Sequence, residues 1–211
     1  MKSQEGVIVF DHPLIQQKLT QARDRHTDRR EFRDLLAEIA ALMVFELTRD
    51  YESETLEVRT PVGMCTGSCL AAEVTLVPIL RAGLGMIESI LHLVPQARVG
   101  HLGIYRDEET LLPVAYYDKL PSDIANSEVI VIDPMLATGG SCSHAVTVIK
   151  GHGARRIKAL CLVAAPEGIH RMRTDHPEAP IYTAAIDEGL NEHGFIVPGL
   201  GDAGDRLFGT G

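Results

Sequence analysis

The chain has no long apolar run. No stretch approaches the roughly 18 residues that a helix needs to cross a bilayer. The longest candidate, at 35–47, is interrupted by Glu38 and Glu46. The N-terminus carries one lysine and no extended apolar region before Asp11, so we expect no signal peptide. These absences predict a cytoplasmic protein without a membrane partner.

Positive charge is also scarce. The chain has 20 lysines and arginines against 29 aspartates and glutamates, which gives a net charge of −9. This balance disfavours broad binding to nucleic acid or to anionic membranes. It does not disfavour a phosphate ligand, because a local nest of backbone amides and a few arginines suffices to bind one.

The four cysteines do not form a metal-binding pattern. Cys65 and Cys69 have a zinc-like separation but lack a second pair of ligands nearby. We therefore expect these two, together with Cys142 and Cys161, to be reduced structural thiols.

Strands and helices alternate along most of the chain, which predicts an α/β fold with a doubly wound, mostly parallel sheet. A length of 211 residues fits one domain spanning 1–211. Before the main sheet we expect a helix capped by Asp11, with Pro13 in its first turn, and a second helix at 28–50. This N-terminal helical segment could supply either a subunit contact or plain core packing. The other expected elements are strands at 6–10, 55–60, 74–80, 99–105, 129–133, 157–165 and 181–186, helices at 83–94, 141–151 and from Pro166, and a polar β-hairpin projecting from the body at 106–121.

The most informative segment is 129–141. Its four consecutive β-branched residues predict a strand buried on both faces. Asp133 follows, then a loop of small residues, then a helix beginning near Ser141. This order places a carboxylate and unpaired backbone N–H groups at the carboxyl end of a parallel strand, where open sheets bind ligands. The segment predicts a site for a phosphorylated sugar, with Asp133 on its hydroxyls.

Three other functional motifs can be excluded. A Walker A motif has a lysine directly before its serine or threonine, and the residue before Ser141 is Gly140, so hydrolysis of a nucleoside triphosphate is disfavoured. The loop also lacks the final glycine of a serine nucleophile elbow. The G-x-G-x-x-G at 199–204 is too close to the C-terminus to open a dinucleotide-binding unit. Its glycines imply close backbone approach, either to a ligand or to another segment.

Two arginines predict a second anion beside the sugar phosphate. Arg81 ends the buried strand at 74–80 and is followed by Gly83 and Gly85, so backbone and guanidinium can approach an anion together. Arg106 begins the hairpin after the next strand, on the same edge of the sheet. His193 lies near a turn, and we interpret it as a hydrogen-bonded structural residue.

On these residues the chain resembles the uracil phosphoribosyltransferase family, within the type I phosphoribosyltransferase group. The matching stretches are 77–86, 103–106, 133–141, 164–168 and 199–210. Pro134 follows Asp133 where most of the wider group carries a second acid, and the uracil branch shares that proline. The resemblance implies transfer of ribose 5-phosphate from phosphoribosyl diphosphate (PRPP) to N1 of uracil, which gives UMP and diphosphate.

The resemblance also implies residue roles. Mg²⁺ would be held through PRPP and water, with no direct protein ligand. Asp202 would bind PRPP through Mg²⁺ or water, or remove the N1 proton, and we favour the first role. The implied catalytic residues are Arg81, Arg106 and Asp202, the implied PRPP contacts are Arg81, Arg106, Asp133, Pro134, Met135, Leu136, Ala137, Thr138, Gly139, Gly140, Ser141 and Asp202, and the implied uracil contacts, in a C-terminal base-binding loop, are Met135, Ile196, Gly201, Asp202 and Ala203.

Several expectations stay open at this point. Phe195 stands where the family often has tyrosine, so a hydroxyl contact to uracil is in doubt. The hairpin at 106–121 is a candidate lid. A GTP effector and a homo-oligomer are further implications of the resemblance. The alternatives are a phosphoribosyltransferase for another base, and a non-catalytic regulator of the same fold that binds nucleotide or RNA.

Overall fold

The structure, a computed structural model, describes residues 2–4, 6–106 and 113–210. At residues 2–4, 105, 106 and 113 it describes the main chain only. No helix in these ranges is both long and apolar enough to cross a membrane.

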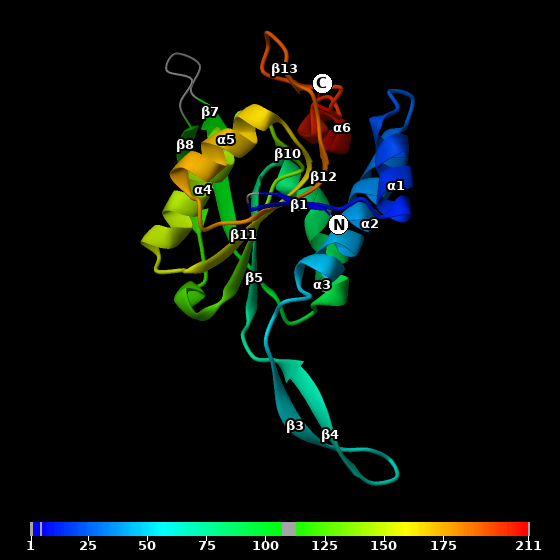
Figure 1. Cartoon of the computed structure of the whole chain (residues 1–211), viewed down its shortest axis with the longest axis vertical. Coiled ribbons are helices and arrows are strands. Elements are labelled where there is room, and N and C mark those ends of the chain that lie inside the picture. Colours follow the sequence, from blue (N-terminus) through cyan, green and yellow to red (C-terminus); the bar gives the residue numbers. More distant parts are fainter. Residues whose placement is uncertain (1, 5, 107–112, 211) are drawn as a thin grey trace.

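A mostly parallel sheet runs through the middle of the molecule, as predicted (Figure 1). Parallel pairing joins all neighbours between the second and seventh strands of the order, while the two outermost pairs are antiparallel. In spatial order the strands are β1 (Lys2–Gln4), β2 (Val7–Val9), β12 (Ile181–Ile186), β11 (Arg156–Ala164), β9 (Glu128–Ile132), β5 (Val74–Leu80), β7 (His101–Arg106) and β8 (Pro113–Lys119). Two short strands, β6 (Arg98–Val99) and β10 (Met135–Leu136), join β5 and β11 at their sides.

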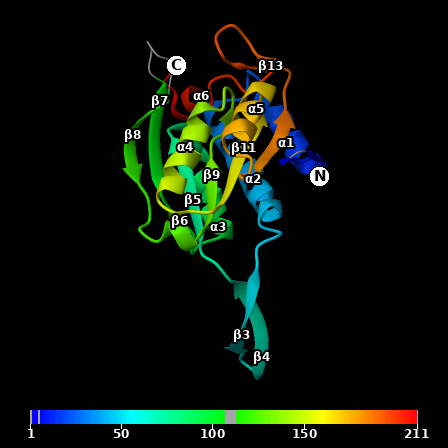
Figure 2. The same ribbon diagram turned by 60° about the vertical axis from the view of Figure 1, so that its left-hand side comes forward.

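Helices cover both faces of this sheet (Figure 2). The central strands β5, β9 and β11 are therefore buried on both faces, which is why they are almost continuously apolar. One core packs α1 (Pro13–Arg23), α2 (Arg29–Leu47), α3 (Ile87–Leu93) and α6 (Ala203–Phe208) on one face. The other core packs α4 (Gly140–Gly151) and α5 (Pro166–Asp175) on the opposite face.

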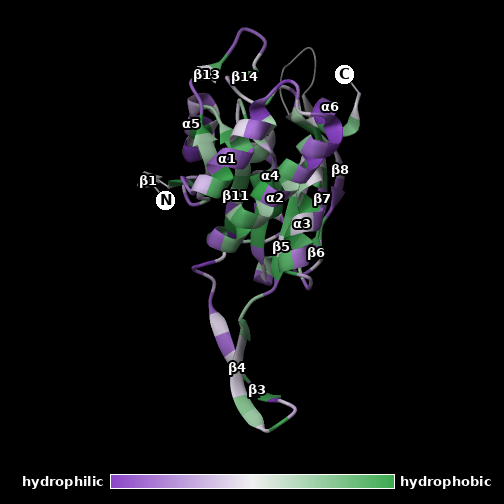
Figure 3. Ribbon diagram, turned by 90° about the vertical axis from the view of Figure 1, so that its right-hand side faces the viewer, coloured by the Kyte–Doolittle hydropathy of each residue, from purple (hydrophilic) through white to green (hydrophobic). Residues whose placement is uncertain are grey.

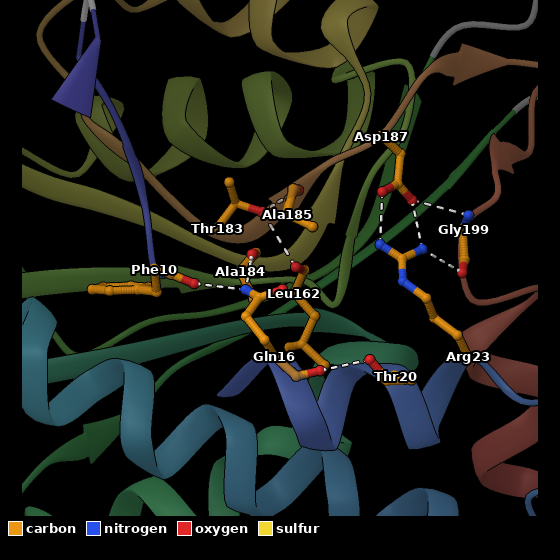
Figure 4. Close-up of polar contacts among 10 residues, drawn as sticks. All are labelled: Phe10, Gln16, Thr20, Arg23, Leu162, Thr183, Ala184, Ala185, Asp187 and Gly199. Atoms are coloured by element: carbon orange, nitrogen blue, oxygen red, sulfur yellow. Dashed lines mark hydrogen bonds and ion pairs between the residues drawn. The ribbon is translucent and has the colours of Figure 1, made fainter. Parts of the chain in front are cut away.

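The side chain of Gln16 ties helix α1 to the sheet. Its amide nitrogen donates to the carbonyl oxygens of Phe10 and Ala184, at 2.8 and 2.7 Å (Figure 4). Both carbonyl groups belong to buried residues that need such partners. The N-terminal turn of α1 is thereby held against β12.

Three local expectations are corrected by the structure. The cap of α1 is His12, whose Nδ1 accepts from the Leu14 N–H at 3.2 Å; Asp11 lies one residue too early, since Pro13 takes the first helical position. The expected helix at 83–94 is split into a 3₁₀ turn, Ala82–Met86, and α3. The C-terminal segment, expected as a loop, ends in helix α6.

The described residues include two hairpins formed by longer strands. The hairpin predicted to project at 106–121 begins earlier, at His101, and its strands β7 and β8 form the antiparallel edge of the sheet. Its tip, 107–112, lies outside the described residues. The element that extends far from the body is a second hairpin, β3 (Ser53–Arg59) and β4 (Met64–Leu70), of which only the first strand was expected (Figure 3). The small polar residues of β4 obscure a strand pattern.

All four cysteines are free thiols. Cys142 and Cys161 are buried in the core between the sheet and helices α4 and α5, whereas Cys65 and Cys69 are exposed on β4. The remaining short elements are a 3₁₀ turn at Ile124–Asn126 and the two-stranded pair β13 (Gly189–Leu190) and β14 (Ile196–Val197).

Candidate active site

The two predicted anion loops lie side by side because their strands are neighbours. β5 and β9 pair in parallel up to Pro78 and Ile132, so the loops that begin at Arg81 and Asp133 leave the same edge. A Cβ at Gly83 would lie 2.5 Å from the Ile132 carbonyl oxygen. Only glycine permits this approach, which brings the two loops into contact.

The loop after β9 forms a cavity of about 220 Å³. This is smaller than the roughly 300–1,000 Å³ of most small-molecule sites, so the cavity suits a small ligand such as the predicted sugar phosphate. The N-cap residue of α4, Gly139, has no side chain to cap the helix. The Gly140 N–H makes only a long contact, 3.5 Å, with the Thr138 hydroxyl, which a bound phosphate could replace. The cavity is lined by Asp133, Met135, Leu136, Ala137, Thr138, Gly139, Gly140, Ser141, Cys142 and Gly194.

The structure thus gathers the predicted PRPP loop around one cavity. Pro134, the remaining member of the predicted loop, is buried behind the lining, and its carbonyl oxygen accepts from the N–H of Leu162 at 3.0 Å. This bond anchors the start of the loop to β11.

The Asp133 carboxyl group is half-buried at the base of this cavity. Burial raises its pKa to about 7, and the nearby charge of Asp202 acts in the same direction. A weak hydrogen bond from the Met135 N–H, at 3.5 Å, opposes the shift. Near neutral pH the protonated and ionised forms of this carboxyl group are therefore both populated, and a ligand whose hydroxyl groups donate to it favours the ionised form.

Helix α5 supports the cavity from behind. A Cβ at Gly168 would lie 2.5 Å from the carbonyl oxygen of Ala137 and 2.6 Å from that of Leu136. The helix therefore packs its main chain directly against the loop. This explains the glycine in the matching stretch 164–168.

The C-terminal segment reaches both loops. Asp202 caps helix α6, where its Oδ1 accepts from the Asp205 N–H at 2.9 Å. Its charge is close enough to act on Asp133. A Cβ at Gly204 would lie 3.8 Å from Nη2 of Arg81. The glycine-rich tail, the Arg81 loop and the Asp133 loop thus meet at one place.

Arg81 has polar partners that the sequence did not reveal. Its guanidinium lies 3.5 Å from Oδ1 of Asp205 and 3.3 Å from Oγ1 of Thr210. The Thr210 hydroxyl in turn donates to Asp205 at 2.6 Å. Arg81 is 55 % exposed, so this contact is weak and the guanidinium remains accessible to an anion. In the sequence, nothing indicated that Asp205, five residues before Thr210, would contact Arg81.

The predicted uracil contacts surround the junction of β14 and α6. Ile196 and Ala203 are buried, Gly201 is exposed with a φ of +71°, and Met135 is half-buried in β10. Neither the N–H nor the C=O of Gly201 has a partner among the described residues. Its main chain is thus available to a ligand.

Two other residues from the sequence analysis remain: Arg106, a predicted site residue, and His193, which was interpreted as structural. The main chain of Arg106 ends β7, the neighbour of β5, so it is on the predicted edge; the structure does not describe its side chain. His193 lies in the exposed turn between β13 and β14, 3.5 Å from Glu192.

The described residues contain no group of three or more His, Cys, Asp or Glu side chains that could cage a metal. Asp133 lines the cavity, and Asp202 is close enough for its charge to raise the pKa of Asp133. This arrangement fits a Mg²⁺ that takes most of its ligands from substrate oxygens and water.

Comparison with known proteins decides the family. The family model described as uracil phosphoribosyltransferase matches residues 9–210. The chain belongs to this family. It is 59 % identical over 207 residues to a uracil phosphoribosyltransferase of Thermoanaerobacter sp. (strain X514), covering 98 % of this chain and 99 % of that one. It is 60 % identical over 205 residues to one of Halalkalibacterium halodurans, covering 97 % and 98 %.

Solved structures agree on the fold. The AQ2163 protein from Aquifex aeolicus matches with a TM-score of 0.93 at 41 % identity, covering 97 % of this chain and 98 % of that one. The adenine phosphoribosyl transferase of Trypanosoma brucei matches with a TM-score of 0.58 at 11 % identity, covering 92 % and 89 %. The type I phosphoribosyltransferase-like fold expected for the chain is confirmed.

The contact between α5 and the loop predicts a selective defect. In Gly168→Ala the new methyl group displaces the carbonyl groups of Leu136 and Ala137, so we expect the KM for PRPP to rise about tenfold or more. Gly151→Ala is the matched control, because a Cβ there meets no atom within 4 Å. Steady-state kinetics check both variants. An unchanged KM for PRPP in Gly168→Ala would contradict the supporting role.

The raised pKa of Asp133 predicts proton release when PRPP binds. At pH 7 about half of the free carboxyl groups are protonated, and the bound sugar selects the ionised form. The KM for PRPP should therefore fall as the pH rises through 7. Calorimetry in two buffers of different ionisation enthalpy measures the release. In Asp133→Asn this contribution should vanish and the KM for PRPP should rise at every pH; equal release in both proteins would sink the assignment.

Proposed function

We propose that this site transfers ribose 5-phosphate from PRPP to N1 of uracil, forming UMP and diphosphate. Family membership supports the reaction. The observation that carries the proposal is the meeting of three segments at one sheet edge: the cavity at Asp133, the Arg81 loop and the glycine-rich tail. A sugar, its leaving group and its acceptor base need three such adjacent subsites.

The sugar phosphate occupies the cavity after β9. The Asp133 carboxylate accepts hydrogen bonds from ribose hydroxyls, and the N–H groups at the start of α4 hold the 5′-phosphate. The loop holds the sugar through its main chain, so small residues suffice there.

The diphosphate leaves toward the arginines. As the C1′–O bond breaks, positive charge grows on the sugar and negative charge on the leaving group. Arg81 and Arg106 stabilise the leaving diphosphate, and one such donor contributes about 3–4 kcal/mol. When bound, Mg²⁺ supplies further positive charge at the diphosphate oxygens. Asp202, the cap of α6, would help to hold PRPP, either through the ion or through water.

Uracil lies against the tail. Its N3–H donor between two carbonyl acceptors matches a main-chain carbonyl flanked by N–H groups, which Ile196, Gly201 and Ala203 provide, while Met135 covers one face of the ring. Cytosine reverses the pattern at N3 and N4, and the unpaired groups that result can discriminate ~10⁴-fold. Phe195, which is 44 % exposed, brings no hydroxyl to the ring.

The proposal predicts diphosphate release that depends on uracil. With PRPP and Mg²⁺, uracil should be the preferred acceptor in a panel with cytosine, hypoxanthine and adenine. Arg81→Ala should lower kcat by about 10²–10³-fold while the affinity for uracil changes little. Release with another base but not with uracil would favour a different base specificity. Release with none of them would favour a non-catalytic nucleotide-binding regulator.

We also propose a homo-oligomer, supported by the exposed hairpin β3–β4. An isolated two-stranded hairpin is marginally stable in water, so this one needs a partner surface. Its register places side chains on two faces, and one of them is mostly apolar and unpartnered. That face carries Leu56, Val58, Cys65, Gly67 and Cys69. Glu54 lies at one end of the same face, where its carboxylate accepts from the Cys69 thiol at 3.6 Å.

A pair of lysine substitutions tests the oligomer. Leu56→Lys places a charge on the apolar face and should dissociate the assembly, while Thr55→Lys adds the same charge to the opposite face and should not. Sedimentation velocity gives the mass of each. A monomeric wild type, or two variants that stay assembled alike, would contradict the role of this face.

Three expectations complete the proposal. Residues 1–211 act as a single domain, because most of the described helices and strands belong to one sheet and its two cores. A cytoplasmic location fits the four free thiols. Activation by GTP and closure of a lid at 106–121 stay predictions of the resemblance.

A further inference from the structure

The tail that we assign to uracil is built mostly from main chain. Regular structure stops after β14 and resumes at α6. Between them, Gly199 and Gly201 have positive φ angles of 62° and 71°. A segment with so few large side chains has little means of fixing its own shape. Its conformation must be set by contacts from outside.

One buried ion pair fixes both polar groups of Gly199. Arg23, the last residue of α1, donates to both carboxylate oxygens of Asp187 at 2.7 and 2.8 Å (Figure 4). The same guanidinium donates to the Gly199 carbonyl oxygen at 2.8 Å. The Gly199 N–H donates to Asp187 at 2.9 Å. The residue is thus held in place from two sides.

The pair itself is attached to rigid elements. The Asp187 side chain is 5 % exposed and that of Arg23 is 23 % exposed, so water competes little for their hydrogen bonds. Asp187 follows β12, and its N–H donates to the carbonyl oxygen of Ala164 in β11 at 2.9 Å. Arg23 belongs to the helix that Gln16 ties to the sheet. The sheet and α1 therefore fix the position of Gly199.

A second arginine fixes the next carbonyl group. Arg206 of α6 donates to the Leu200 carbonyl oxygen at 2.9 Å and to that of Ala22 at 2.6 Å. Its guanidinium lies over the Phe32 ring, 3.8 Å from the centroid. Gly199 and Leu200 are thereby both held, and Gly201 is the adjacent residue whose main chain is free for a ligand.

We propose that Arg23 and Asp187 are positioning residues that orient the main chain of the uracil site. They act through Gly199 and touch neither substrate. They should govern the affinity for uracil and the discrimination against cytosine, but not the binding of PRPP. The inference rests on the proposed uracil site at 196–203.

Two conservative variants of the full chain test the inference. Arg23→Lys keeps the charge, but a single ammonium group cannot reproduce the planar fork that bonds Asp187 and Gly199 together. Asp187→Asn keeps the shape and removes the charge. In each we expect the KM for uracil to rise about tenfold or more and the preference for uracil over cytosine to fall. The KM for PRPP should stay within about twofold.

A destabilised control separates positioning from simple loss of stability. Leu47 is fully buried at the far end of α2, away from the tail, so Leu47→Ala should lower Tm and leave both KM values unchanged. If this control raises the KM for uracil at a comparable loss of Tm, the positioning role is overturned. The same holds if the KM values for uracil and PRPP rise together in the Arg23 and Asp187 variants.

The outcomes also separate this inference from the proposed function. An active wild type whose KM for uracil is unchanged in Arg23→Lys and Asp187→Asn overturns the positioning role alone. A wild type without diphosphate release in the presence of uracil overturns both. If Arg23→Lys does not fold, Asp187→Asn decides the outcome by itself.

Discussion

The main chain of the loop at 133–141 and of the strand before it touches two neighbouring elements with no side chain between them. Gly83 brings the Arg81 loop against the end of β9, and Gly168 brings α5 against Leu136 and Ala137. These contacts fix the end of β9 and the residues Leu136 and Ala137, which line the cavity. The position of the carboxyl group, the row of N–H groups and the arginine all depend on them. A site assembled from main chain can hold a sugar phosphate with few side chains of its own.

The tail is held by a different kind of contact. Arginines from three places reach it: Arg23 from α1, Arg33 from α2 and Arg206 from α6 itself. Each donates to a main-chain carbonyl oxygen in 199–207, and together they join the C-terminal segment to the first two helices. The N-terminal helices thus have a role beyond covering the sheet. They also hold in place the C-terminal segment that we propose binds the base.

The sequence predicted the sheet and the cavity because both depend on local patterns. An unbroken apolar strand followed by Asp133 and small residues defines its own geometry, and the parallel order of strands then places Arg81 beside it. It could not predict Asp205 beside Arg81, or Arg23 beside Gly199, because those pairs join residues 124 and 176 positions apart. The hairpin β3–β4 was half missed, since the glycine, serine and cysteines of β4 carry no clear alternation. The N-cap of α1 was misplaced by one residue because aspartate is a common cap and histidine a rare one.

The carboxylate and the hydroxyl that contact Arg81 have a consequence for turnover. In the proposed reaction, a diphosphate that binds this guanidinium takes the place of Asp205 and Thr210, so one set of polar partners is exchanged for another. The net gain from such an exchange is smaller than for a bare cation in the same place. Arg81 would therefore bind diphosphate with moderate strength. When the diphosphate leaves, the Asp205 carboxylate can resume its contact with Arg81.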